Sequence, residues 1–306
     1  MKYDSVLDAI GNTPLIKLSH ISPENGAVIY GKFEGVNIGG SIKTRTAYEM
    51  ICKAEADGIL KKDMTIVEAT SGNQGVGLAL VGAIRGYKVL IIMPDSVSEE
   101  RRKIITQYGA TVELVHDNDN IGECIARCKE LAEEYAKKGG YYLPAQFENP
   151  ANVEAQKKTG EEIVRDLERV DGFCAGVGTG GTLTGIGTVL REHNPDIEIW
   201  AVEPDRAAVL SGSTNIESHL QMGIGDGIIP AILDQNVYDR LCMINDDEAI
   251  AVSKMLALKE GILAGISSGT NVAAALKMAQ KLGKGKIVVT VLPDTGERYY
   301  STPLFE

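Results

Sequence analysis

The sequence has no long apolar run, no excess of basic residues and no regular cysteine framework. Its longest apolar runs, such as 89–93 and 287–292, are far shorter than the roughly 20 residues that a membrane-spanning helix needs, so we expect no membrane partner. Lysine and arginine together number 31 against 42 aspartate and glutamate residues, and the net charge of -11 would repel a phosphate backbone. We therefore expect no nucleic-acid partner either.

The five cysteines are an odd number without framework spacing, and no signal-peptide pattern opens the sequence. Both features predict a protein of the reducing cytoplasm. Cys124 and Cys128 can share one helix face, but no further Cys/His pair near them completes a zinc set. We interpret the two as structural thiols, and we predict no metal site.

The residues that are present, 44% hydrophobic and 24% charged, have the composition of a globular protein. Short β-branched runs alternate with amphipathic stretches, which predicts α/β structure with parallel sheets. Helices are expected to begin near residues 75, 98 and 122, and another to cover 153–167. Strands are expected at 65–68, 88–93, 111–115, 172–177, 197–203 and 287–292.

In open parallel sheets, ligands bind beyond the carboxyl ends of the strands, so the turns that follow strands are candidate sites. One Gly/Ser-rich segment, at 37–42, precedes a helical pattern that runs to about Ala56. Lys43 lies in the first turn of this predicted helix. The helix dipole disfavours a cation there, which would lower the pKa of Lys43. A lowered pKa is what an imine-forming amine needs, although an ordinary solvated lysine is the alternative.

Two further turns can bind anions. The segment 68–77 places the hydroxyls of Thr70 and Ser71 at a helix start, where a carboxylate can bind, or where Ser71 or Asn73 simply caps the helix. The segment 176–182 has four glycines and two threonines, which suits a compact phosphate. It also matches G-x-G-x-x-G, so a dinucleotide fold remains an alternative.

These turns, in this order and together with 265–270 and 292–299, closely resemble the cysteine synthase family, also called O-acetylserine sulfhydrylases. That family belongs to the tryptophan-synthase-β-like group of pyridoxal-phosphate enzymes. The resemblance runs essentially from end to end of the chain. It also includes the segments 10–15, 101–102, 146–152 and 202–204.

The resemblance implies the fold-type-II architecture of two open, mostly parallel sheet domains. Residues 1–12 and 36–148 would form a smaller N-terminal α/β domain, residues 13–35 and 149–306 a larger C-terminal one, and the active site would lie between them. The resemblance also implies a small amino-acid substrate and a homodimer. Docking onto an acetyltransferase is left open by the sequence.

The resemblance also assigns roles to residues. Lys43 would hold pyridoxal 5'-phosphate as a Schiff base, Asn73 would hydrogen-bond its ring hydroxyl, and Ser267, chosen over Ser268, would face the pyridine nitrogen. A neutral serine at that nitrogen favours chemistry at the β-carbon over transamination. The phosphate cradle would be Gly178, Thr179, Gly180, Gly181 and Thr182. The substrate-binding residues would be Thr70, Ser71, Gly72, Gln74 and Gln146.

The implied reaction is β-elimination or β-replacement through an α-aminoacrylate, with Lys43 acting in turn as nucleophile, base and acid. Three positions depart from the family pattern: Thr44 stands where Asp is common, Ile38 where Pro is common, and Asp226 where a small apolar residue is usual. Asp226 belongs to a glycine segment that lines the active site in the family. A carboxylate there would repel hydrosulfide but could act as a general base for water or a thiol.

We therefore predict conversion of L-cysteine and water to L-serine and hydrogen sulfide, with Lys43 and Asp226 as catalytic residues. If Asp226 instead turns to solvent or caps a turn, the alternative is the cysteine synthase reaction of O-acetylserine with sulfide. Lanthionine or cystathionine formation by thiol addition is another alternative. Outside this class, the glycine pattern leaves an NAD-binding oxidoreductase.

Overall fold

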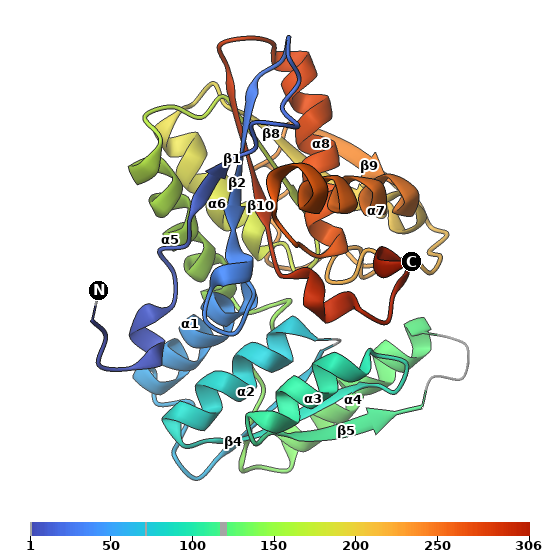
Figure 1. Ribbon diagram of the computed structural model, residues 1–306. Helices are drawn as coiled ribbons and strands as arrows, with labels where there is room; N and C mark the ends of the chain where they lie inside the picture. Colours follow the sequence, from blue (N-terminus) through green and yellow to red (C-terminus); the bar gives the residue numbers. More distant parts are fainter. Residues whose placement is uncertain (1, 71, 117–120) are drawn as a thin grey trace.

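The computed structural model describes residues 2–70, 72–116 and 121–306 and contains two open sheets flanked by helices (Figure 1). The larger sheet has the strand order β1-β2-β10-β7-β8-β9 and is parallel except where β1 pairs with β2. The smaller sheet has the order β5-β4-β3-β6 and is parallel throughout. The predicted fold class is confirmed.

The elements follow one another in β/α alternation over most of the chain. The strands are β1 (Leu15–Lys17), β2 (Val28–Phe33), β3 (Thr65–Ala69), β4 (Lys88–Pro94), β5 (Thr111–Val115), β6 (Tyr141–Tyr142), β7 (Gly172–Gly176), β8 (Glu198–Pro204), β9 (Arg240–Ile244) and β10 (Ile287–Leu292). The α-helices are α1 (Lys43–Ala56), α2 (Asn73–Arg85), α3 (Glu99–Gln107), α4 (Ile121–Lys137), α5 (Ala151–Asp166), α6 (Gly181–His193), α7 (Asp246–Met255) and α8 (Ile266–Leu282). Short helical turns are η1 (Val6–Ala9), η2 (Glu34–Val36), η3 (Asp205–Ala207), η4 (Leu256–Glu260), η5 (Gly296–Tyr299) and η6 (Pro303–Phe305).

Alternate residues of the smaller sheet face two different layers of helices. Ile66 points into a cluster with residues of α1 and α2, whereas its neighbour Val67 packs with Cys124 and Cys128 of α4. This alternation follows from the two-residue repeat of a strand. Both side chains are buried and neither forms a disulfide, and burial raises the pKa of Cys128 to about 12.

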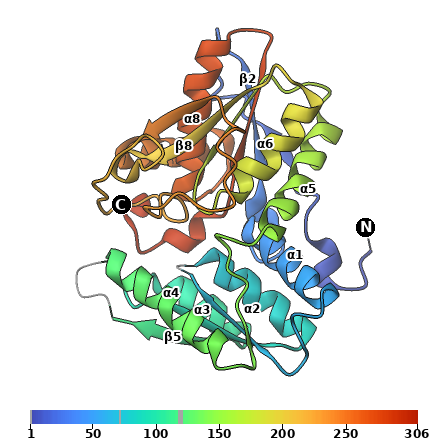
Figure 2. The same ribbon diagram turned by 180° about the vertical axis from the view of Figure 1, so that it is seen from behind.

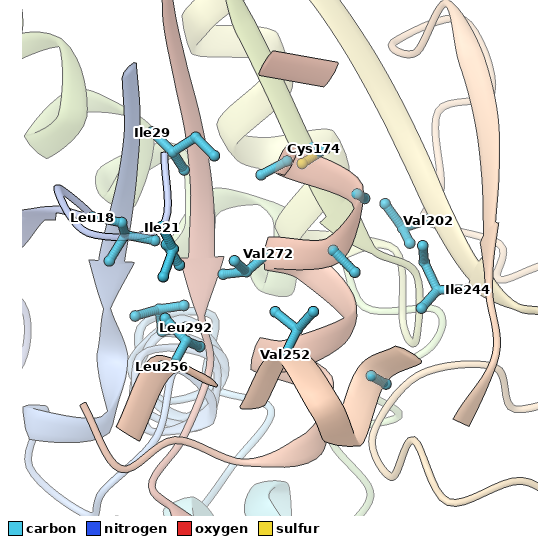
Figure 3. Packing of buried hydrophobic residues seen from close by; sticks show 14 of the residues in the cluster. Leu18, Ile21, Ile29, Cys174, Val202, Ile244, Val252, Leu256, Val272 and Leu292 are labelled. Carbon is cyan, nitrogen blue, oxygen red and sulfur yellow. The ribbon is translucent and has the colours of Figure 1, made fainter. Parts of the chain in front are cut away.

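The larger sheet is covered in the same way on both faces. Figure 3 shows the core on one face of this sheet. There Val272 of α8 lies among side chains of α7 and of the sheet, and Cys174 and Val202 are two of the sheet residues. On the opposite face, Phe173 packs against residues of α5 and α6. A strand buried on both faces reads as a continuous apolar run, which is why β7, β8 and β10 could be predicted from sequence.

Helix α1 lies between α2 and α5 (Figure 2) and is tied to the rest of the chain by buried charges. The Arg45 guanidinium contacts Glu34 at 2.9 Å and Glu162 of α5 at 2.6 Å. Lys32 of β2 also contacts Glu162, at 2.7 Å. Paired charges of this kind are held in one geometry because breaking the pair would leave an uncompensated buried charge. The start of α1, where Lys43 lies, is therefore fixed relative to the larger sheet.

Each sheet draws on a separate part of the chain, apart from β1 and β2. Residues 15–33 form the edge of the larger sheet, whose remaining strands all follow residue 171, while the smaller sheet uses residues 65–142. We retain the predicted domain limits as a proposal. Within the described ranges, no helix is long and apolar enough to cross a bilayer.

Candidate active site

One cavity gathers the turns that the sequence singled out. It is lined by residues that follow β3 and β4 of the smaller sheet, by residues that follow β7 and β10 of the larger sheet, and by the starts of α1 and α8. Carboxyl ends of parallel strands are where ligands bind in open sheets. The lining includes the predicted site residues Lys43, Thr70, Gly72, Asn73, Gln74, Gln146, Gly178, Thr179, Gly180, Thr182, Asp226 and Ser267.

Lys43 is the first residue of α1, as the sequence predicts, and its amine lies in this cavity. Burial lowers the pKa of Lys43 from 10.5 to about 8, although the negative charges of Asp226 and Glu68 oppose the decrease. The Lys43 Nζ atom donates a hydrogen bond of 3.3 Å to Thr179 Oγ1. A buried amine with a lowered pKa is suited to forming an imine.

The glycine turn between β7 and α6 allows unusually close backbone approach. A methyl group at Gly178 would collide with the backbone oxygen of Gly223, and Gly180 has a φ of +84°, which strains other residues. Gly181 is the first residue of α6 and is buried against Asn152 instead of lining the cavity. The turn therefore presents backbone and the Thr182 hydroxyl at the start of a helix, where an anion binds well.

These features fit pyridoxal phosphate. The glycine turn with the start of α6 can hold a phosphate, and Lys43 supplies a buried amine of lowered pKa across the same cavity. Ser267 also lines the cavity, whereas Ser268 is fully buried away from it, with an Oγ atom that has no hydrogen-bond partner among the described residues. Of the two serines, Ser267 is therefore the one that a bound ring can reach.

The turn after β3 brings polar groups to the opposite wall. Gly72 packs so closely against the Arg101 side chain that a methyl group would overlap it. The Asn73 amide is held at both ends, because its Nδ2 donates to Asp294 at 2.7 Å and its Oδ1 accepts from Arg298 at 2.6 Å. Gln74 is buried, and its Oε1 has no partner in the part of the chain that the structure describes. Ser71 lies outside the described residues.

Gln146 comes from the segment between β6 and α5 and reaches the same cavity. Its backbone N–H donates to Glu68 at 3.3 Å. Its backbone oxygen accepts a 2.8 Å hydrogen bond from Asn152, whose Nδ2 also donates to Thr179 at 2.9 Å. Asn152 thus joins the Gln146 segment to the glycine turn.

Asp226 lies in the loop 223–227 and lines the cavity together with Lys43. Burial raises the pKa of its carboxyl, while the positive charges of Lys43 and Lys129 act in the opposite direction. Among the described residues, no hydrogen bond is formed by this carboxylate, and it does not cap the loop. The loop is instead braced by His219, whose Nε2 atom lies 3.0 Å from the Gly225 oxygen.

Sequence reasoning missed several residues of this site. Arg101 and Met222 line the cavity and contact each other, with 2.8 Å between Arg101 Nη1 and Met222 Sδ. Asn152 and Asn271 support the glycine turn, since Asn271 Oδ1 accepts a 2.7 Å hydrogen bond from the Gly176 N–H. Arg101 and Asn152 belong to the segments that carried the family resemblance, which was the only available signal for them.

Comparisons with known proteins agree with this geometry. The sequence profile of the family described as pyridoxal-phosphate dependent enzyme matches residues 6–294. A cysteine synthase from Staphylococcus aureus is 48% identical over 305 residues, which cover 99% of this chain and 97% of that protein. The family match spans the G-x-G-x-x-G segment, so the dinucleotide alternative is wrong.

Solved structures are also similar. The crystal structure of O-ureido-L-serine synthase superposes with a TM-score of 0.94 at 41% identity, covering 100% of this chain and 96% of that one. A hydrogen sulfide-producing enzyme from Fusobacterium nucleatum superposes with a TM-score of 0.90 at 40% identity, covering 97% of this chain and 100% of that one. The names of these similar proteins therefore refer to different reactions.

Proposed function

The chain belongs to the pyridoxal-phosphate-dependent enzyme family, in its cysteine synthase-like branch, and we propose that it converts L-cysteine and water into L-serine and hydrogen sulfide. The family activity is replacement or elimination of a β-substituent of a small amino acid. The choice of reaction rests on one observation, the carboxylate of Asp226 in the cavity that contains the Lys43 amine.

Pyridoxal phosphate, when bound, withdraws electrons from the substrate and so makes the α-proton acidic and the β-substituent easier to expel. Lys43 holds the cofactor before substrate arrives and then takes the α-proton at Nζ, which its lowered pKa allows. Thr70 and the buried Gln74 bind and orient the substrate carboxylate, and Gln146 assists from the facing segment.

Asp226 is the proposed base for the second half of the reaction. After the bond between the β-carbon and sulfur breaks and hydrosulfide leaves, its carboxylate accepts a proton from water as the water oxygen bonds to the β-carbon. Lys43 Nζ returns its proton to the α-carbon to give serine, and the proton on Asp226 passes to solvent, where hydrosulfide becomes hydrogen sulfide. Burial raises the pKa of this carboxyl, and a higher pKa makes it a stronger base than an ordinary aspartate. Negative charge at this place also disfavours entry of hydrosulfide, which would reverse the reaction.

The second candidate is the cysteine synthase reaction, in which sulfide displaces acetate from O-acetylserine. It is favoured by the 48% identity to a cysteine synthase over almost the whole chain. Thiol addition to give lanthionine or cystathionine is a further candidate, because a general base serves a thiol as well as water. Asp226 argues against the cysteine synthase reaction, since sulfide needs no base and is repelled by a carboxylate, but it does not distinguish water from a thiol.

The experiment is a comparison of products and of kcat/KM with the purified holoenzyme. L-Cysteine alone should yield serine and sulfide in equal amounts, with a higher kcat/KM than O-acetylserine with sulfide shows for cysteine formation. Lys43→Ala should abolish both reactions. Faster cysteine formation, with no serine from cysteine, would leave the cysteine synthase reaction as the function. A preference for added thiols would favour the third candidate.

The homodimer is also part of this proposal and rests on the family resemblance. The substrate class, a small amino acid, is that of cysteine synthase homologues. Light scattering of the purified protein should give about twice the chain mass of 32.8 kDa. A monomer mass would contradict the proposed assembly without affecting the proposed reaction.

A further inference from the structure

The turn 293–298 touches three separate segments of the active site, although the proposed function gives it no role. It follows β10 and includes the first three residues of η5, and Pro293 lines the cavity. Its side chains or backbone contact the segment before Lys43, the start of α2 at Asn73, and the start of α8 just before Ser267. These segments come from distant parts of the sequence, so a common support is needed to hold them in register.

The first contact fixes the Asn73 amide. A guanidinium only donates hydrogen bonds and a carboxylate only accepts them, so Arg298 selects the oxygen of the amide and Asp294 selects its nitrogen. Asn73 can therefore not rotate its amide by half a turn without losing both bonds. One N–H of Asn73 Nδ2 remains for a ligand in the cavity.

The second contact holds the turn that leads into Lys43. The Ile42 N–H donates to the Pro293 oxygen at 2.9 Å, and Ser41 forms a β-bridge with Asp294. Arg298 Nη2 also donates to the Gly39 oxygen. The guanidinium that orients Asn73 is thus the same one that holds the backbone four residues before Lys43.

The third contact holds the start of α8. The Gly265 N–H donates to the backbone oxygen of Asp294 at 3.3 Å, and Ala264 forms a β-bridge with Thr295. Gly265 lies so close to the Asp294 carboxylate that a methyl group there would overlap it. Ser267, which lines the cavity, follows Gly265 by two residues in the first turn of α8.

Asp294 itself is fully buried, and its burial is costly. Its Oδ2 accepts from Asn73 and, at 2.8 Å, from the Tyr299 hydroxyl, while its Oδ1 has no hydrogen-bond partner among the described residues. A buried carboxylate with one unsatisfied oxygen disfavours folding and calls for a functional explanation. A need for a pure acceptor opposite Asn73 supplies one.

We propose that Asp294 and Arg298 are positioning residues that fix the Asn73 amide and the Lys43 turn for the cofactor. The inference rests on the proposed contact between Asn73 and the ring hydroxyl of pyridoxal phosphate. Neither Asp294 nor Arg298 takes part in the reaction itself. Both act through residues that touch the cofactor, so their loss should alter how the cofactor is held.

The test is a double-mutant cycle on cofactor binding. Cofactor-free Asp294→Ala, Asn73→Ala and the double variant are titrated with pyridoxal phosphate while the absorbance maximum of the bound cofactor is recorded. Loss of one oriented hydrogen bond should raise the dissociation constant about tenfold in each single variant and shift the maximum. The double variant should bind no more weakly than Asn73→Ala alone, because Asp294 acts through Asn73. Asp294→Asn keeps an acceptor but can also present a donor to Asn73, so its dissociation constant should lie between those of the parent and Asp294→Ala.

Two controls keep the outcomes distinct. Glu297→Gln changes an exposed side chain of the same turn and should leave the dissociation constant unchanged. If Asp294→Ala does not fold, Arg298→Lys replaces it, since a single ammonium cannot reach both Asn73 Oδ1 and the Gly39 oxygen. We expect this variant to shift the absorbance maximum as well.

The results separate failure of this inference from failure of the proposed function. In one outcome, folded Asp294→Ala or Arg298→Lys binds pyridoxal phosphate with the parental affinity and absorbance maximum, while Asn73→Ala binds it clearly more weakly. That result would overturn only the positioning role. Additive losses in the double variant would overturn it too. No change in Asn73→Ala would instead contradict the proposed cofactor contact of Asn73.

Discussion

The pKa of Lys43 should control how fast the cofactor-free protein captures pyridoxal phosphate, because only the neutral amine attacks the aldehyde. Burial lowers that pKa from 10.5 to about 8. The decrease corresponds to about 3 kcal/mol against the ammonium form. At pH 7 the neutral fraction is then about 9%, against about 0.03% for an ordinary lysine. Capture at pH 7 should therefore be about 300-fold faster than an exposed lysine would give.

The direction of the pH dependence follows from the same value. Lys43 is neutral above its pKa, so the capture rate should rise with pH and level off above about 8. Asp226→Asn removes a negative charge that favours the ammonium, so the midpoint should move to lower pH. Glu68→Gln should move it in the same direction, whereas the exposed Glu297→Gln should leave it in place.

The assay is stopped-flow absorbance after mixing cofactor-free protein with pyridoxal phosphate at constant ionic strength from pH 6 to 10. Titration of the cofactor's own phosphate, near pH 6, is common to all variants and cancels in the comparison. A parental midpoint near 10 would refute the burial of the Lys43 amine. Identical midpoints for the parent and Asp226→Asn would refute the proximity of the two side chains.

Two further predictions concern the phosphate cradle and acid stability. Thr182→Val keeps the side-chain shape but removes a hydroxyl at the start of α6, so the dissociation constant for pyridoxal phosphate should rise about tenfold; an unchanged constant would exclude a phosphate contact. Although burial opposes it, ion pairing with Arg45 and Lys32 lowers the pKa of Glu162 from 4.5 to about 2. The ionised Glu162 side chain therefore stabilises the folded protein above pH 4.5, and this stabilisation is lost as the pH falls toward 2. In urea unfolding, Glu162→Gln should lose about 3 to 5 kcal/mol at pH 7 and show a weaker acid dependence than the parent; parallel pH curves would contradict this.

Strand β10 was predictable because the chain buries it on both faces, whereas β5, an edge strand without a buried residue, was predictable from its β-branched run. The limits of β5 and β10 agree with the predicted 111–115 and 287–292. Helix starts were less predictable at the site. Helix α2 begins at Asn73, two residues before the predicted start, because the polar side chains of Asn73 and Gln74 interrupt the apolar pattern although their backbone is already helical.

The site was predictable where one local turn carries the chemistry and unpredictable where distant segments meet. Lys43 at a helix start and the glycine turn 176–182 could be read from local sequence. The link from Asn152 to the glycine turn could not, because the hydrogen bond from Asn152 to Thr179 joins residues 27 positions apart, which no local pattern predicts. The support from Asp294 to Asn73 spans an even longer separation.

The central claim, that Asp226 activates water, is tested most directly by separating the two halves of the reaction. Holoenzyme is mixed rapidly with L-cysteine, and sulfide release and serine formation are followed separately in the parent, Asp226→Asn and Asp226→Ala. Asp226→Asn keeps the size of the side chain and loses the base, so the first sulfide should leave at the parental rate while serine formation falls about 100-fold or more. Asp226→Ala should also gain activity with O-acetylserine and sulfide. Equal rates of serine formation in all three proteins would contradict the claim and leave Asp226 without a role in the reaction.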